Sequence, residues 1–86
     1  MQIIVILWGE NMAFHEKLKD LRLSKLPPIT QTDLAKSLGV TQRKVSFLET
    51  GATQPSLNDL FGICIFFKVS ADYLLDLPNN MEYPND

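Results

Sequence analysis

The apolar positions in the central part of the chain repeat with the period of an α-helix. In the first such segment, Phe14, Leu18 and Leu21 fall at i, i+4 and i+7, the spacing of one buried helical face. We expect a helix from about Ala13 to Lys25, with charged residues such as Lys17 on its solvent side. The Leu-Pro-Pro-Ile stretch that follows should end this helix, because proline cannot donate a backbone hydrogen bond and constrains the residue before it.

Hydroxyl residues mark the starts of four further helices. Thr30, Thr41, Ser56 and Ser70 each precede an apolar periodic segment and can accept a hydrogen bond from a backbone N–H of the first turn. A glycine, which tolerates positive φ, follows the second and the third helix. The predicted fold is therefore an all-α bundle of five helices, the last four over about 31–38, 42–50, 57–68 and 71–77.

The N-terminal residues break this pattern with six consecutive apolar side chains. Such a run is too short to cross a bilayer and lacks the basic region and cleavage site of a signal peptide. Its β-branched content predicts a strand, and a lone strand needs a partner for its backbone groups. Since no second strand-like segment follows, we expect pairing with a second subunit; the alternatives are an unstructured leader or read-through upstream of a start at Met12. The residues concerned are Ile3, Ile4, Val5, Ile6, Leu7 and Trp8. The expected organisation is an apolar extension at 1–12, a helical domain at 13–77 and a polar tail at 78–86.

Composition limits the possible chemistry. The 86 residues suffice for one domain, and the single cysteine, Cys64, excludes an internal disulfide and fits a reducing interior. One histidine, His15, is too little for a metal site, so no metal or cofactor is expected, and a solvated position on the first helix is the expectation for it. The sequence also has no nucleophile and base at a plausible spacing, so we do not expect an enzyme.

Charge is distributed unevenly along the chain. The net charge is only −2, which by itself does not favour a nucleic-acid partner. Residues 14–55, however, hold seven basic and four acidic side chains, a net +3, whereas residues 56–86 hold one and five, a net −4. The first three helices are therefore the basic part of the molecule, and a nucleic-acid partner stays open.

The third helix separates apolar from polar side chains most clearly. Val45 and Leu48 share the side that should face the core, and the opposite side carries Gln42, Arg43, Ser46 and Phe47. Arginine can bond guanine O6 and N7, glutamine can bond adenine N6 and N7, and an apolar group can cover the thymine methyl in the major groove. An ordinary solvated helix face is the alternative, and Phe47 could instead serve a protein interface or lie partly buried beneath the first helix.

The stretch from Leu18 to Leu75 resembles the Cro/C1-type, lambda-repressor-like helix-turn-helix family, also called XRE-like. The second helix and its turn match the family's T-Q-x-x-L-A-x-x-L-G-V run, and the third matches its I/V-S-x-x-E-x-G pattern. The segment from Pro55 to Leu60 matches the P-S region, and Val69 to Leu75 matches V-S-x-D-x-L-L. The chain departs from the family in its longer Leu-Pro-Pro-Ile connection, in the aromatic Phe47, in Ile65 where a charge is common, and in the N-terminal run.

The resemblance implies roles for individual residues. Gln31 would contact a phosphate or base, and Gln42 and Arg43 would read bases, flanked by Ser46 and Phe47. The expected phosphate contacts are Thr41, Lys44, Thr53 and Gln54. A further family pair, Arg22 with Glu49, would form an ion pair that orients the third helix.

These residues predict a sequence-specific regulator of transcription that binds double-stranded DNA. We expect no membrane partner and a cytoplasmic location, in a bacterium or as a phage-encoded protein. A homodimer is expected, with Ile65 and the N-terminal run as its contacts, and repression by operator occupancy as its mode of action. The alternative is an antitoxin or another protein-binding module with the same fold, in which Phe47, Ile65 and the N-terminal run would meet a toxin or other protein.

Overall fold

The helices form where the sequence places their starts. The computed structural model describes residues 12–77, and within that range it contains five α-helices and no strand. The helices are α2 (Phe14–Leu23), α3 (Gln31–Leu38), α4 (Gln42–Thr50), α5 (Leu57–Phe67) and α6 (Ala71–Leu75). The predicted all-α fold is confirmed over this range. The predicted strand from Ile3 to Trp8, its pairing, and the tail at 78–86 lie outside the described residues.

Each predicted hydroxyl cap makes its bond. The side chains of Thr30, Thr41, Ser56 and Ser70 accept hydrogen bonds of 3.0 to 3.1 Å from the backbone N–H three residues later. These bonds satisfy donors that the first turn of a helix leaves without an intrahelical partner. The caps therefore fix where α3 to α6 begin.

Two helices end about two residues earlier than predicted. Helix α2 ends at Leu23 rather than near Lys25, and the Ser24 hydroxyl donates to the carbonyl of Asp20 at 2.7 Å. Helix α6 ends at Leu75 rather than at Leu77, because Asp76 takes a left-handed conformation with φ +59°. In the closing turn of α6, the N–H of Leu77 bonds back to the carbonyl of Asp72 at 3.0 Å.

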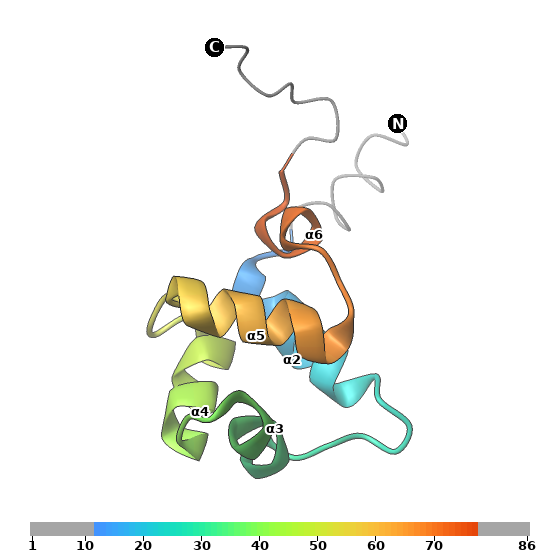
Figure 1. Cartoon of the computed structure of the whole chain (residues 1–86), viewed down its shortest axis with the longest axis vertical. Helices are drawn as coiled ribbons and strands as arrows, with labels where there is room; N and C mark the ends of the chain where they lie inside the picture. Colours follow the sequence, from blue (N-terminus) through green and yellow to red (C-terminus); the bar gives the residue numbers. More distant parts are fainter. Residues whose placement is uncertain (1–11, 78–86) are drawn as a thin grey trace.

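Every helix contributes to one hydrophobic core. Its fully or almost fully buried members are Leu18, Leu34, Ala35, Val45, Leu48, Ile63 and Leu74. Helices α3 and α4 pack against each other at one end of the molecule, α6 lies at the other end, and α5 crosses in front of α2 between them (Figure 1). None of the helices in residues 12–77 has the length and apolarity needed to traverse a bilayer.

Lys17 is a correction to the sequence-based expectation, because it lies inside the bundle with only 2% of its surface exposed. Its ammonium donates to the carbonyl of Tyr73 at 2.6 Å and lies 4.8 Å from the centroid of the Tyr73 ring. The Asp76 carboxylate lies 4.0 Å from the same nitrogen. A long lysine stem can pack against apolar groups while its charge reaches polar atoms, so Lys17 ties α6 to α2.

Candidate nucleic-acid interface

Helix α4 has one side fixed in the core and one side open. Val45 and Leu48 are fully buried, whereas Gln42, Arg43 and Phe47 are exposed and Ser46 is half-buried. The preceding turn runs through Gly39, whose φ of +74° is readily accessible to glycine. Within the described residues, the polar side of α4 is thus available to another molecule.

A buried ion pair holds the end of α4 to α2. The Nε and Nη2 atoms of Arg22 donate to the two carboxylate oxygens of Glu49 at 2.6 and 3.0 Å, and Nη1 donates to the carbonyl of Ile29 at 2.8 Å. The hydrogen bond to Glu49 raises the pKa of Arg22 further, against the opposing effect of burial. Because both partners are buried and their donors and acceptors are matched, this pair fixes a geometry more than it adds stability.

Two glutamine amides extend this ion pair to the open side of α4. Gln31, at the start of α3, donates from Nε2 to the Glu49 carboxylate at 3.0 Å. Gln42, at the start of α4, donates from Nε2 to Oε1 of Gln31 at 2.7 Å. Both glutamines are predicted DNA contacts, but the sequence pattern does not predict the bond between them. The one signal for it is that each residue begins a helix of the same two-helix motif. The network sets the position of the Gln42 amide, whose oxygen keeps its acceptor capacity.

Lys44, expected to contact phosphate, is engaged within the protein. Its ammonium lies 3.1 Å from the Asp59 carboxylate at the start of α5. Burial acts to raise the pKa of Asp59, but the hydrogen bonds from Ser56 and the charge of Lys44 together lower it. A phosphate would have to compete with Asp59 for this lysine.

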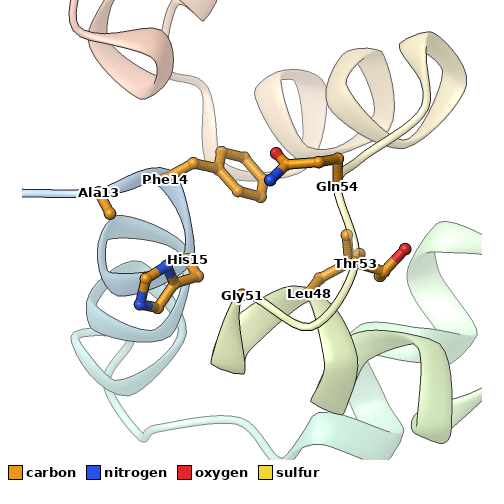
Figure 2. Close-up of a pocket in the computed structure, with 7 residues that line it drawn as sticks. All are labelled: Ala13, Phe14, His15, Leu48, Gly51, Thr53 and Gln54. Carbon is orange, nitrogen blue, oxygen red and sulfur yellow. The ribbon is translucent and has the colours of Figure 1, made fainter.

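The other expected phosphate contacts lie at the two ends of α4. The Thr41 hydroxyl oxygen accepts a hydrogen bond from the backbone N–H of Lys44 as the cap of α4, and its hydroxyl hydrogen can still be donated to another acceptor. Thr53 and Gln54 lie in the loop after α4 and line a cleft of about 250 Å³ that also includes Ala13, Phe14, His15, Leu48 and Gly51. Phe14 and Gln54 point toward one another from opposite sides of this cleft (Figure 2).

His15 is half-buried in this cleft, rather than fully solvated as its sequence context indicates. Gly51 ends α4 with φ +83°, and a Cβ atom added there would lie 3.1 Å from Nδ1 of His15. The close approach of the imidazole and the backbone joins the start of α2 to the end of α4. Sequence spacing gives no sign of it, because 36 positions separate the two residues.

Ile65, expected at a dimer contact, lies on an exposed apolar side of α5. Leu57, Phe61 and Ile65 follow one another at four-residue intervals and are 84%, 68% and 62% exposed. We call these three residues the α5 apolar face. Phe66 and Cys64, by contrast, pack against the core, and burial raises the pKa of the Cys64 thiol.

Two helices joined by a short turn, the second fixed by its apolar side and open on its polar side, define a helix-turn-helix protein. A family model described as helix-turn-helix matches residues 18–74. The chain belongs to the Cro/C1-type helix-turn-helix family of DNA-binding transcriptional regulators.

Named relatives and a solved structure agree with this assignment. The chain is 41% identical over 64 residues to the HTH-type transcriptional activator BcrR of Enterococcus faecalis, covering 74% of this chain and 30% of the relative. It is 36% identical over 67 residues to the uncharacterized HTH-type transcriptional regulator YqaE of Bacillus subtilis (strain 168), covering 78% and 56%. The chain therefore spans less than two thirds of the length of either relative. The P22 c2 repressor, solved in complex with a synthetic operator, superposes with a TM-score of 0.67 at 30% identity, covering 74% of this chain and 94% of the repressor chain.

Proposed function

We propose that this protein binds double-stranded DNA sequence-specifically by placing α4 in the major groove, as a homodimer that represses transcription by occupying an operator. The observation that carries the proposal is the open side of α4, where Gln42 and Arg43 are exposed while Val45 and Leu48 hold the helix to the core. An α-helix fits the major groove, and the groove edges distinguish all four base pairs.

The chemistry of this side matches groove edges. Arg43 can donate two parallel hydrogen bonds to guanine O6 and N7, an arrangement worth about 1–3 kcal/mol of discrimination. Gln42 is held by Gln31, and its remaining donor and acceptor suit an adenine edge. A preset side chain loses less conformational entropy on binding than a free one.

Backbone amides at the start of α3 would meet the DNA backbone. The first turn of a helix presents N–H groups and the positive end of its dipole, which together attract phosphate. The side chains proposed to add phosphate contacts there and around α4 are Gln31, Thr41, Lys44, Thr53 and Gln54. Contacts of this kind fix the register of the protein on DNA, and the positively charged Lys44 would also increase the salt dependence of binding.

Repression is proposed because occupying a site needs no contact beyond the DNA itself. The named relatives include one activator, and the structural neighbour is a repressor. A reporter gene controlled by a DNA site that the protein binds shows whether the protein represses or activates transcription. Repression lowers expression of the reporter when the protein is present, and a rise in expression would contradict this part of the proposal.

Selection of bound sites from random duplex DNA tests DNA binding directly. We expect an enriched palindromic site whose half-sites lie about one helical turn apart, because a two-fold dimer places its reading helices at that spacing. Arg43→Ala should weaken binding by about 1–3 kcal/mol per half-site and remove the preference at one base pair in each half-site.

A matched control separates loss of a base contact from loss of a positive charge. Lys19→Ala removes an exposed charge on α2, a helix that supplies none of the proposed DNA contacts, and should leave the sequence preference intact. If no sequence were enriched, or if Arg43→Ala kept every preference of the original protein, α4 would not be the reading helix.

A protein partner, such as a toxin, is the second candidate function. The observation in its favour is the α5 apolar face, since exposed apolar patches commonly mark sites of protein contact. Co-expression with the product of a neighbouring gene, followed by purification through a tag on this chain, would reveal a stable heteromeric complex. A complex that persisted in Arg43→Ala and dissociated in Ile65→Lys would support this candidate.

A further inference from the structure

Arg43 and Phe47 lie one turn apart on the open side of α4, and their side chains interact. The guanidinium carbon Cζ of Arg43 is 5.5 Å from the centroid of the Phe47 ring, within the range of an attractive cation–π interaction. On a helix, an aromatic side chain leans toward the N-terminus, so the residue at i+4 covers its neighbour at i. The ring remains 41% exposed, so its outer surface is open to a further contact.

Within residues 12–77, the Phe47 ring is the group that contacts the Arg43 guanidinium. The ion pairs among residues 12–77 join Lys17 to Asp76, Arg22 to Glu49 and Lys44 to Asp59, and none involves Arg43. A guanidinium placed over the face of a ring keeps N–H groups at its edge free for other acceptors. Those edges are the groups that donate to guanine O6 and N7.

We propose that Arg43 and Phe47 form a single recognition unit that selects a guanine with a neighbouring thymine. Phe47 fixes the plane of the guanidinium for the guanine and covers the thymine C5-methyl group with the exposed part of its ring. The inference rests on the proposed function, because it requires α4 in the major groove. It goes further by assigning Phe47 two tasks, one toward Arg43 and one toward the base beside the guanine.

Two side-chain replacements separate these tasks. Phe47→Leu keeps an apolar group for the methyl but removes the aromatic face, whereas Phe47→Ala removes both. The measurement is the dissociation constant, by fluorescence anisotropy, for the site enriched in the selection experiment. Three duplexes are compared: the selected site, the same site with the guanine pair exchanged, and the same site with deoxyuridine in place of thymine, which removes only the methyl group.

The expected results differ for each variant. For the original protein, replacing one thymine by deoxyuridine should weaken binding about fourfold, because the burial of one methyl group is lost. Phe47→Leu should retain this sensitivity to the methyl while its preference for guanine falls about threefold. Phe47→Ala should bind the thymine and deoxyuridine duplexes equally and show the same reduced preference for guanine.

A double-mutant cycle tests whether the two residues act together. Once Arg43→Ala has removed the guanidinium, adding Phe47→Leu should cause no further loss of affinity, because both substitutions then affect the same contact. As a control, the fold losses of affinity caused by Phe47→Leu and Gln42→Ala should multiply when the two substitutions are combined.

Since Phe47 lies on the surface, circular dichroism should show the same helical content for all variants.

The outcomes distinguish the inference from the proposed function. If the original protein bound deoxyuridine as tightly as thymine, or if Phe47→Leu kept the full preference for guanine, the recognition unit would be refuted while DNA reading by α4 stood. If the original protein enriched no sequence, or Arg43→Ala changed no preference, the proposed function would fail first.

Discussion

At the scale of single residues, Asp59 shows how one carboxylate serves both the fold and the candidate interface. It accepts the backbone N–H of Ser56 at 2.9 Å while the Ser56 hydroxyl accepts the N–H of Asp59 at 3.0 Å, which is a reciprocal capping box. It also holds Lys44 at 3.1 Å. The negative charge therefore lies at the positive end of the α5 dipole and beside a cation, two favourable positions.

We predict that Asp59 makes the free energy of unfolding depend on pH in the acidic range. Its pKa is lowered in the folded state, so the folded protein gains stability from the ionised carboxylate above the ordinary aspartate pKa of about 3.9. This contribution is lost as the pH falls below that value through the lowered pKa. Asp59→Asn keeps a similar shape but removes the charge, and at pH 7 it should cost about 0.5–1 kcal/mol.

Urea denaturation at a series of pH values measures this effect. The difference in unfolding free energy between the original protein and Asp59→Asn should be constant from pH 7 to about 5 and shrink toward pH 3. Asp33→Asn, on an exposed acid at the start of α3, provides a control for the general effect of losing one carboxylate. A difference that grew as the pH fell would contradict the assigned role of Asp59.

The sequence pattern predicts the cap by Ser56, but it does not predict the ion pair between Asp59 and Lys44. The Ser56 cap is local, because a hydroxyl residue directly before an apolar periodic segment can be recognised in the sequence. The pairing of Asp59 with Lys44 depends on the angle between α4 and α5, which no local pattern contains. Lys17 and the bond between Gln31 and Gln42 escaped prediction for the same reason.

At the scale of elements, the two glycines that end α3 and α4 make a matched comparison. Gly39 and Gly51 both have positive φ, +74° and +83°. A Cβ at Gly39 would meet nothing within 4 Å, whereas at Gly51 it would meet the ring of His15 at 3.1 Å. The first position is therefore constrained by its backbone alone, and the second by its backbone and a neighbour.

We predict that Gly51→Ala is more destabilising than Gly39→Ala. A left-handed conformation costs a residue with a Cβ about 1–2 kcal/mol, and this is the expected loss for Gly39→Ala. Gly51→Ala should lose about 1 kcal/mol more, because the His15 ring must shift. Thermal or urea unfolding gives both values. In a His15→Ala background the excess should vanish, and an excess that persisted there would show that the contact with His15 is not its cause.

Element boundaries show where sequence patterns reach their limit. The starts of α3 to α6 were located to the residue because a hydroxyl cap is a specific local signal. The end of α6 was placed two residues late, since Asp76 and Leu77 continue the apolar and polar pattern and only the left-handed backbone at Asp76 breaks it. A non-glycine residue at positive φ gives no comparable warning in the sequence.

At the scale of the whole molecule, the residues predicted for the interface lie near one another because they come from adjacent helices of one motif. The side of α4 followed from its period, and the structure leaves Gln42, Arg43 and Phe47 exposed as that period requires. Of the α5 apolar face, only Ile65 was a predicted contact. Because α5 is apolar on almost all sides, its hydrophobic period does not indicate which side faces solvent. Exposure in the folded chain identifies Phe61 and Leu57 as its other members.

We predict that two copies of the protein associate through the α5 apolar face. A two-fold axis near Phe61 would run two copies of α5 antiparallel, so that Leu57 of each meets Ile65 of the other and one set of residues fills both sides. We therefore expect a dimer by analytical ultracentrifugation and a monomer for Phe61→Lys, which would bury a charge without a partner. Leu23→Lys is the matched control, because it places a lysine at an apolar residue that is 47% exposed on α2, and it should remain dimeric.

Because one reading helix spans only a few base pairs, Phe61→Lys should also lose most of its affinity for a palindromic site while retaining weak binding to a half-site. A dimer that survived Phe61→Lys would place the axis elsewhere on the molecule, and an original protein that was monomeric both free and on DNA would contradict the proposed dimer.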